Sequence, residues 1–210
     1  MTDILPSGDR RAFVRDLALG ALGAASLSAA LPGVLSAESH GVAAPAWDLS
    51  WADRLKGKHR AVFDSADLGD GFAFFNATTF MNQYRDVYGA ADADAQAVVV
   101  MRGKGLFMAL NDAMWAKYGI GGVLELKGSP VANPYARAIT GLLGRGATML
   151  ACNVAATYFS GEAAKKAGVA ADAVHDEWLA NLVPGVVIMP SGIFSLIRAQ
   201  EAGCSLVKVA

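Results

Sequence analysis

The sequence predicts an α/β fold: a three-layer α/β/α arrangement built on a parallel five-stranded sheet. Short apolar runs recur along the chain from about residue 58, and segments with helical periodicity separate them. The first four runs are continuously apolar rather than alternating. Continuous runs are typical of strands that are buried on both faces, and strand–helix alternation is typical of a parallel sheet with helices on both sides.

Five apolar runs are expected to form the strands. The first four end in polar or charged residues or in glycine, and the fifth lies at the C-terminus. They cover residues 60–63, 97–101, 147–151, 186–189 and 205–209.

Apolar residues three and four positions apart predict helices in the gaps between these strands. Asn133 is expected to cap one helix, with Pro134 as its first residue and an end near Gly144. Residues 119–132 contain four glycines and are expected to form a long loop, which is typical of a functional segment or an oligomer contact. The expected helices cover residues 72–83, 106–118, 134–143, 172–182 and 193–200.

The overall composition excludes several classes of protein. Hydrophobic residues make up 54% of the 210 residues and charged residues 18%. This balance is too apolar for disorder and too interrupted for a protein with several membrane spans. The formal net charge is −1 and the basic residues are scattered, so no nucleic-acid partner is expected.

Residues 1–37 read as an export signal. Arg10 and Arg11 are followed by Phe13, and an uncharged run of Ala, Leu, Gly and Ser covers residues 17–31. This order resembles a twin-arginine signal, which predicts export to the periplasm through the Tat translocase. The alternative is an ordinary amphipathic or anchoring helix. Residues 38–57 are expected to form an exposed leader that Trp47 and Trp51 attach to the domain, and residues 58–210 to form that domain.

Ligands of open parallel sheets bind outside the carboxyl ends of the strands. That rule gathers a thiol, a guanidinium, a carboxylate and several small residues at one edge, and the start of the first helix adds an amide. The candidate ligand-binding residues are Asp64, Asn76, Arg102, Gly103, Asn153, Ser191 and Gly192.

Cys152 is the candidate catalytic residue. It ends the third strand and precedes a helix, and a helix N-terminus favours the nucleophilic thiolate. The alternative is a buried structural cysteine. The only other cysteine, Cys204, begins the fifth strand, so the two thiols are expected at opposite edges and unbonded. No Cys or His spacing indicates a metal site, and no motif indicates a cofactor.

The order of these motifs resembles the DsrE/DsrF-like family over most of residues 58–209. The matching segments are 75–77, 99–103, 150–153, 189–193 and 200–203. The resemblance implies a small parallel α/β domain, flavodoxin-like in general architecture, that forms homo- or hetero-oligomers. It also implies that a cysteine after the third strand accepts sulfur as a persulfide and passes it to a partner. Cys152 occupies that place.

The leading hypothesis is an exported DsrE-like protein that binds or transfers sulfur through Cys152, with Arg102 and Asn153 shaping a pocket that tolerates anions. A sulfur donor or acceptor protein is the expected partner. The alternative is a noncatalytic ligand-binding or assembly protein that uses the same pocket, so enzyme activity is left open. A cofactor-loaded redox protein also fits export in the folded state. The apolar composition and residues 119–132 predict a homo-oligomer.

The export signal is directly testable. Changing Arg10 and Arg11 together to Lys is expected to leave the precursor in the cytoplasm, because the translocase recognises the arginine pair. Cell fractionation and immunoblotting measure this. Normal periplasmic accumulation of the double variant would remove the twin-arginine assignment.

Overall fold

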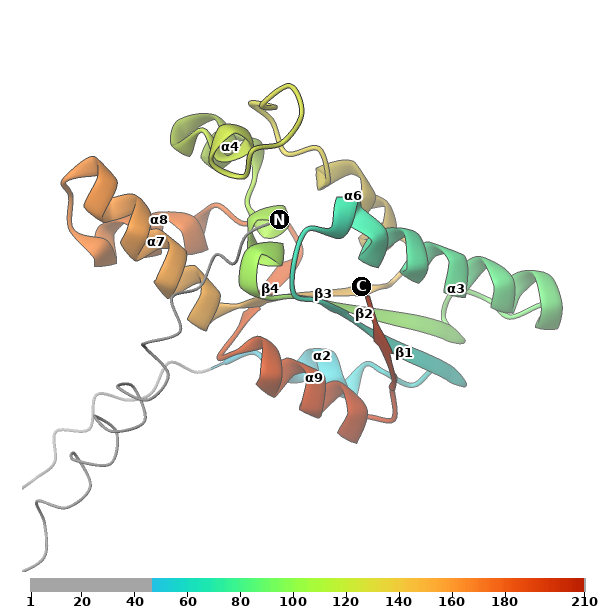
Figure 1. Cartoon of the computed structure of the whole chain (residues 1–210). Helices are drawn as coiled ribbons and strands as arrows, with labels where there is room; N and C mark the ends of the chain where they lie inside the picture. Colours follow the sequence, from blue (N-terminus) through green and yellow to red (C-terminus); the bar gives the residue numbers. More distant parts are fainter. Residues whose placement is uncertain (1–46, 210) are drawn as a thin grey trace, which may run out of the picture. The chain divides into compact units, whose positions relative to one another are not determined.

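The computed structural model describes residues 47–209 (Figure 1). The expected signal segment and the first part of the expected leader lie outside the described residues. The centre of the domain is a five-stranded sheet with the order β4-β3-β2-β1-β5, in which every neighbouring pair is parallel. The predicted α/β class and three-layer arrangement are therefore confirmed.

Each strand coincides with one of the apolar runs. In the register, Phe63 lies opposite Val99 on one side and Val207 on the other, and Val99 lies opposite Met149. The strands are β1 (His59–Ser65), β2 (Ala95–Met101), β3 (Thr148–Cys152), β4 (Val186–Met189) and β5 (Ser205–Lys208).

Helices occupy the segments between the strands. Short 3-10 helices follow β1 and β2, and α-helices make up the rest. The α-helices are α2 (Ser50–Asp53), α3 (Phe72–Tyr88), α4 (Asp112–Tyr118), α5 (Ile120–Val123), α6 (Ala136–Gly144), α7 (Asn153–Ala167), α8 (Ala171–Ala180) and α9 (Gly192–Glu201). The 3-10 helices are η1 (Gly69–Gly71) and η2 (Gly103–Ala109).

The order of the strands explains which helices cover which face. From β1 to β4 each strand is added next to its predecessor, and right-handed crossovers then place all the connecting helices on one face. After β4 the chain runs back past the whole sheet and adds β5 beside β1. The same handedness therefore places α9 on the opposite face, where it lies with α2 (Figure 1).

Two apolar cores result, one on each face of the sheet. The larger core contains Phe63, Val99 and Met149 from the strands and Trp115 and Trp178 from the covering helices. The smaller core lies between the sheet and the pair α2 and α9. Its buried members are Trp51, Ala52, Leu55, Val62, Val98, Val100, Leu150, Met189, Ala199 and Cys204.

The expectation of an exposed leader is wrong for residues 50–57. These residues include α2, and Trp51 is completely buried between the sheet and α9. The Trp51 indole N–H lies 3.1 Å from the Met189 sulfur at the end of β4. The face that α9 covers needs further apolar cover, because a helix of ten residues is too short to shield it alone. The folded domain therefore begins before residue 58.

The single helix expected over residues 106–118 is two elements. Leu110 is extended and forms an isolated antiparallel bridge with Leu182, which separates η2 from α4. Asn111 then caps α4, and its side chain accepts a hydrogen bond from the Met114 N–H at 3.1 Å. Apolar residues continue across this break because both elements are buried in the larger core.

The segment between α4 and α6 also differs from its expectation. Residues 120–123 form the short helix α5 instead of loop, and Ile120 is buried in the larger core. Asn133 does not cap α6 directly. Its buried side chain donates to the backbone carbonyls of Met108 and Leu110 and accepts from the Tyr135 N–H, so α6 begins only at Ala136.

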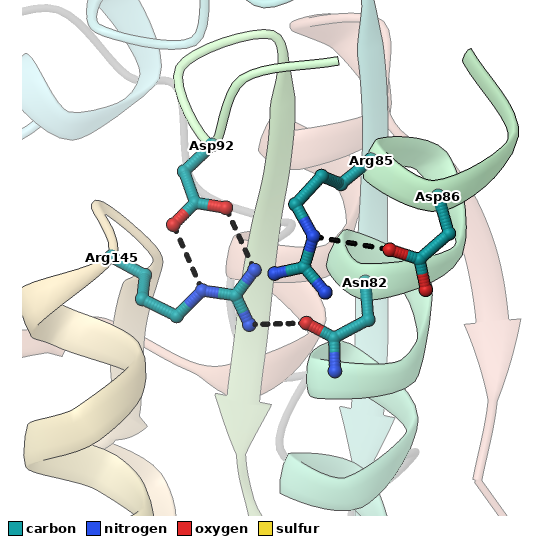
Figure 2. Close-up of polar contacts among 5 residues, drawn as sticks. All are labelled: Asn82, Arg85, Asp86, Asp92 and Arg145. Atoms are coloured by element: carbon teal, nitrogen blue, oxygen red, sulfur yellow. Dashed lines mark hydrogen bonds and ion pairs between the residues drawn. The ribbon is translucent and has the colours of Figure 1, made fainter. Parts of the chain in front are cut away.

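A polar network connects two crossover segments near the amino ends of the strands (Figure 2). Arg145, after α6, donates two hydrogen bonds to the Asp92 carboxylate at 2.7 and 2.9 Å. It donates a third, at 3.1 Å, to the side-chain amide oxygen of Asn82 on α3. The hydrogen bond from Arg145 holds the pKa of Asp92 below its usual value. Asp92 therefore has a structural partner. Figure 2 also shows the exposed pair Arg85–Asp86 on α3.

Between residues 47 and 209, no helix is long and apolar enough to cross a membrane.

Replacing Trp51 by Ala is expected to destabilise the domain by about 3–5 kcal/mol, because it leaves a large cavity beneath the sheet. Chemical denaturation of the purified protein measures this. Leu49→Ala is the matched control, since Leu49 is 40% exposed and adjoins the same helix. Similar unfolding midpoints for the two variants would show that α2 is dispensable.

Candidate functional site

The chain leaves the sheet in opposite directions at the ends of β3 and β4. After β3 it enters α7 on the face of the larger core, and after β4 it enters α9 on the other face (Figure 1). Adjacent strands whose following helices lie on opposite faces define the topological switch point where open α/β sheets bind ligands. Four of the predicted site residues lie at this switch point, and the others lie at the ends of β1 and β2 or in α3. The four are Cys152, Asn153, Ser191 and Gly192.

Cys152 lies at this switch point as the last residue of β3. It also caps α7, and its sulfur accepts a hydrogen bond from the Ala155 N–H at 3.4 Å. The residue is 5% exposed. The N-terminal end of a 15-residue helix carries partial positive charge, so the sulfur of Cys152 lies in positive surroundings.

Arg102 lies beside Cys152, because β2 and β3 are neighbours and Met101 pairs with Ala151. Its guanidinium makes a two-pronged ion pair with Asp64, with bonds of 2.6 and 2.8 Å. The hydrogen bonds that Arg102 donates to Asp64 are the main reason that the pKa of Arg102 is raised, and the neighbouring Cys152 contributes a smaller electrostatic effect in the same direction. Arg102 therefore interacts electrostatically with the thiol, and Asp64 offsets part of its charge.

The side chain of Arg102 also packs on the first residue of α9. A Cβ atom added to Gly192 would lie 2.5 Å from the Cβ of Arg102. Because β3 lies between β2 and β4, this contact spans the end of β3, where Cys152 is found. The contact accounts for the glycine at the start of α9, and Cys152 itself is buried in the larger core.

Gly103 has a structural role. Its φ of +51° is unfavourable for other residues, and an added Cβ would lie 2.4 Å from the carbonyl oxygen of Ala66. A Cβ added to Gly105 would likewise lie 2.3 Å from the carbonyl oxygen of Ser65. These glycines let η2 pack on the turn after β1, and this close packing explains why glycine is found at both positions.

Asn153 has a partner that the sequence did not indicate. Its side-chain oxygen lies 2.9 Å from Nε2 of His175 on α8, 22 residues further along the chain. His175 is part-buried, so this contact joins the start of α7 to α8. The signal was the buried pair Val174 and Trp178, which places His175 at the border of the buried face of α8.

Two other predicted residues have different outcomes. Ser191 lies at the switch point, but its hydroxyl oxygen caps α9 by accepting from the Phe194 N–H at 3.0 Å. Asn76 lies in the second turn of α3, and the structure gives its side chain no hydrogen bond to the described residues. The pairing of Asp64 with Arg102 also went unpredicted, although opposite charges at the ends of neighbouring strands were a usable signal.

The two cysteines are separate and free, as expected. Cys204 precedes β5 in the smaller core and is 6% exposed. Burial raises the pKa of the Cys204 thiol to about 11, although the charge of Arg60 lowers it slightly. Cys204 is therefore protonated at neutral pH and provides an internal comparison for Cys152.

The chemistry available at the switch point is that of a single thiol in positive surroundings. The polar groups around Cys152 mostly have partners within the protein, and few remain for a separate small ligand. Within residues 47–209 no cluster of three or more His, Cys, Asp or Glu side chains is arranged to hold a metal ion. The fold and this site thus define an α/β domain with one cysteine at the switch point.

Comparison with models of known protein families found no match, and comparison with curated proteins found none. Among solved structures, a protein of unknown function from Methanobacterium thermoautotrophicum is similar to this chain. The TM-score is 0.41 at 16% sequence identity, and the alignment covers 72% of this chain and 99% of the other. The site is therefore interpreted from its own geometry.

Iodoacetamide near neutral pH is expected to modify Cys152 at least about tenfold faster than Cys204, because only the thiolate reacts. Labelling of Cys204 should become faster as the pH rises toward 11, where its thiolate forms. Timed labelling followed by peptide mass spectrometry measures both rates. Equal, slow labelling of both thiols would contradict an activated Cys152.

Two variants separate charge from access in this experiment. Arg102→Met keeps an aliphatic chain over Gly192 and removes the positive charge, so labelling of Cys152 should slow by about threefold to tenfold. Asp64→Asn removes the opposing negative charge and should accelerate it. Faster labelling in Arg102→Met would show that Arg102 only restricts access.

Proposed function

We propose that this protein is an exported, DsrE-like sulfur carrier that binds or transfers sulfur as a persulfide on Cys152. The observation that carries the proposal is the placement of the Cys152 sulfur. It caps α7, lies beside Arg102 and occupies the switch point of the sheet. A thiolate and a persulfide anion both need this kind of positive surroundings.

The proposed step is a transfer between two sulfur nucleophiles. The Cys152 thiolate attacks the outer sulfur of a donor persulfide, R–S–SH, and forms Cys152–S–SH as the donor S–S bond breaks. The donor leaves as the thiolate R–S⁻, so no external oxidant or reductant is needed. An acceptor thiolate then takes the outer sulfur and regenerates the Cys152 thiolate.

The groups around Cys152 have distinct roles in this proposal. The Ala155 N–H and the N-terminal end of α7 stabilise negative charge on the inner sulfur. Arg102 faces the same charge, and its ion pair with Asp64 keeps the guanidinium in place. Cys152 is only 5% exposed, which favours a small persulfide group over a bulky substrate.

The alternative of a noncatalytic ligand-binding protein fits this edge less well. The Asp64 carboxylate, the Asn153 amide oxygen and the Ser191 hydroxyl oxygen all have protein partners. A separate ligand would have to displace these bonds before it gained its own. The thiol of Cys152 needs no such exchange.

Exposed apolar side chains around the carboxyl edge support the proposed homo-oligomer. Three helices begin at this edge, and each has large apolar residues exposed near its start. These residues are Phe72 and Phe75 on α3, Val154 and Tyr158 on α7, and Ile193, Phe194 and Ile197 on α9. A second copy of the chain that covered this edge of the sheet would also shield the persulfide from solvent.

Incubation with a low-molecular-weight alkyl persulfide is expected to add one sulfur atom to the protein at Cys152. Intact-mass measurement detects the addition, and peptide mapping after alkylation locates it. Subsequent addition of a small thiol should return the protein to its original mass, because the outer sulfur is transferable.

Cys152→Ser is expected to lose the added sulfur and Cys204→Ser to retain it. Cys204 is the matched control because it is equally buried but lacks a helix N-terminus and has a raised pKa. Persulfide on Cys204, or none on the wild-type protein, would refute the proposal.

A further inference from the structure

A cavity lies on the larger-core side of the domain, between α4 and α5 on one side and α7 and α8 on the other. Its volume is about 700 Å³, within the range of small-molecule sites. Its α7 residues lie between positions 159 and 167, roughly 10 to 20 Å along that helix from Cys152. The cavity is therefore separate from the switch point, and nothing in the proposed sulfur chemistry uses it.

The floor of the cavity is aromatic. The Phe107 ring lies 4.8 Å from the Phe159 ring and 5.8 Å from the Trp178 ring, and the Trp178 ring lies 5.5 Å from that of Tyr118. Ile120 adds an aliphatic wall. Connected rings with edge-to-face contacts provide a large, rigid apolar surface for a flat or branched hydrocarbon group.

The rim of the cavity is positively charged. Its lining contains three lysines, Lys117, Lys165 and Lys166, and one glutamate, Glu162. Lys165 pairs with Glu162 at 2.7 Å, and Lys117 pairs with Glu177 from α8. Lys166 makes no ion pair within the described part of the chain. An anionic group at the rim would therefore find Lys166 without an ion-pair partner. Lys117 and Lys165 already have one carboxylate partner each.

A polar atom in the wall also lacks a partner. The indole N–H of Trp178 is buried and makes no hydrogen bond. The nearby Tyr118 hydroxyl donates to Glu177 and keeps lone pairs that could accept, but it forms no hydrogen bond with the indole in this structure. A buried donor without an acceptor is unfavourable, and a small shift of the ring would offer it to an oxygen in the cavity.

We infer that this cavity binds a small organic carboxylate with an apolar body. The aromatic floor contacts the hydrocarbon group, and the carboxylate lies at the rim against Lys166. The inference uses none of the groups around Cys152, so it stands or fails independently of persulfide formation.

The probe for this inference is 4-phenylbutyrate, and its uncharged amide, 4-phenylbutyramide, is the matched control. Titration of the ¹⁵N-labelled full-length chain, followed by NMR, reports on the indole N–H groups of the four tryptophans. Trp178→Phe identifies the Trp178 signal. Saturable movement of that signal with 4-phenylbutyrate, and weaker binding of the amide, is the expected result.

Two variants test the two halves of the cavity. Lys166→Gln should weaken binding by about threefold to fivefold, as expected for one exposed ion pair, and added salt should reduce the difference. Phe159→Ala should weaken it at least about tenfold, because it removes a ring from the floor. Lys58→Gln and Cys152→Ser should bind like the wild type, since neither residue lines the cavity.

Thermal unfolding of each variant separates loss of binding from loss of folding. No saturable movement of the Trp178 signal at millimolar probe would overturn the inference. Equal binding of the acid and its amide, or an unchanged affinity in Lys166→Gln, would overturn the assignment to a carboxylate.

Discussion

The handedness of parallel strand connections determines where every other part of this domain lies. Because β1 to β4 are added in one direction, their crossovers fill one face of the sheet with helices. The return to β5 then requires α9 to cross the other face. That reversal creates the switch point between β3 and β4 and brings Gly192 against Arg102. It also leaves a second apolar face, which α2 helps to cover.

The two candidate sites use the same helix in different ways. At its N-terminus α7 provides backbone N–H groups and partial charge, and Cys152 occupies that end. Further along, the same helix contributes one aromatic ring and two of the three lysines at the rim of the cavity. Charge governs the first site, and apolar surface with a charged border governs the second. A thiol carrier and a carboxylate pocket can therefore coexist, because their contacts do not overlap.

The polar contacts around Cys152 show how a site can be built from structural groups. Asp64 neutralises part of the charge of Arg102, Ser191 caps α9, and Asn153 contacts His175. Each contact lowers the number of free polar groups and increases the rigidity of the edge. The sulfur of Cys152 remains as the reactive group of this edge, and the Arg102 side chain beside it is about one-third exposed.

The sequence by itself determined the strands, the α/β class and the edge at which Cys152 and Arg102 meet, because continuous apolar runs and the ends of parallel strands are local signals. It misjudged α2 and the break at Leu110, since burial of Trp51 and the bridge to Leu182 depend on distant segments. The partners of Asn153 and Asp64, and the aromatic cavity, were decided only by the tertiary structure. Side chains 22 and 38 residues apart meet there through packing of whole helices and strands, and no local pattern in the sequence specifies that packing.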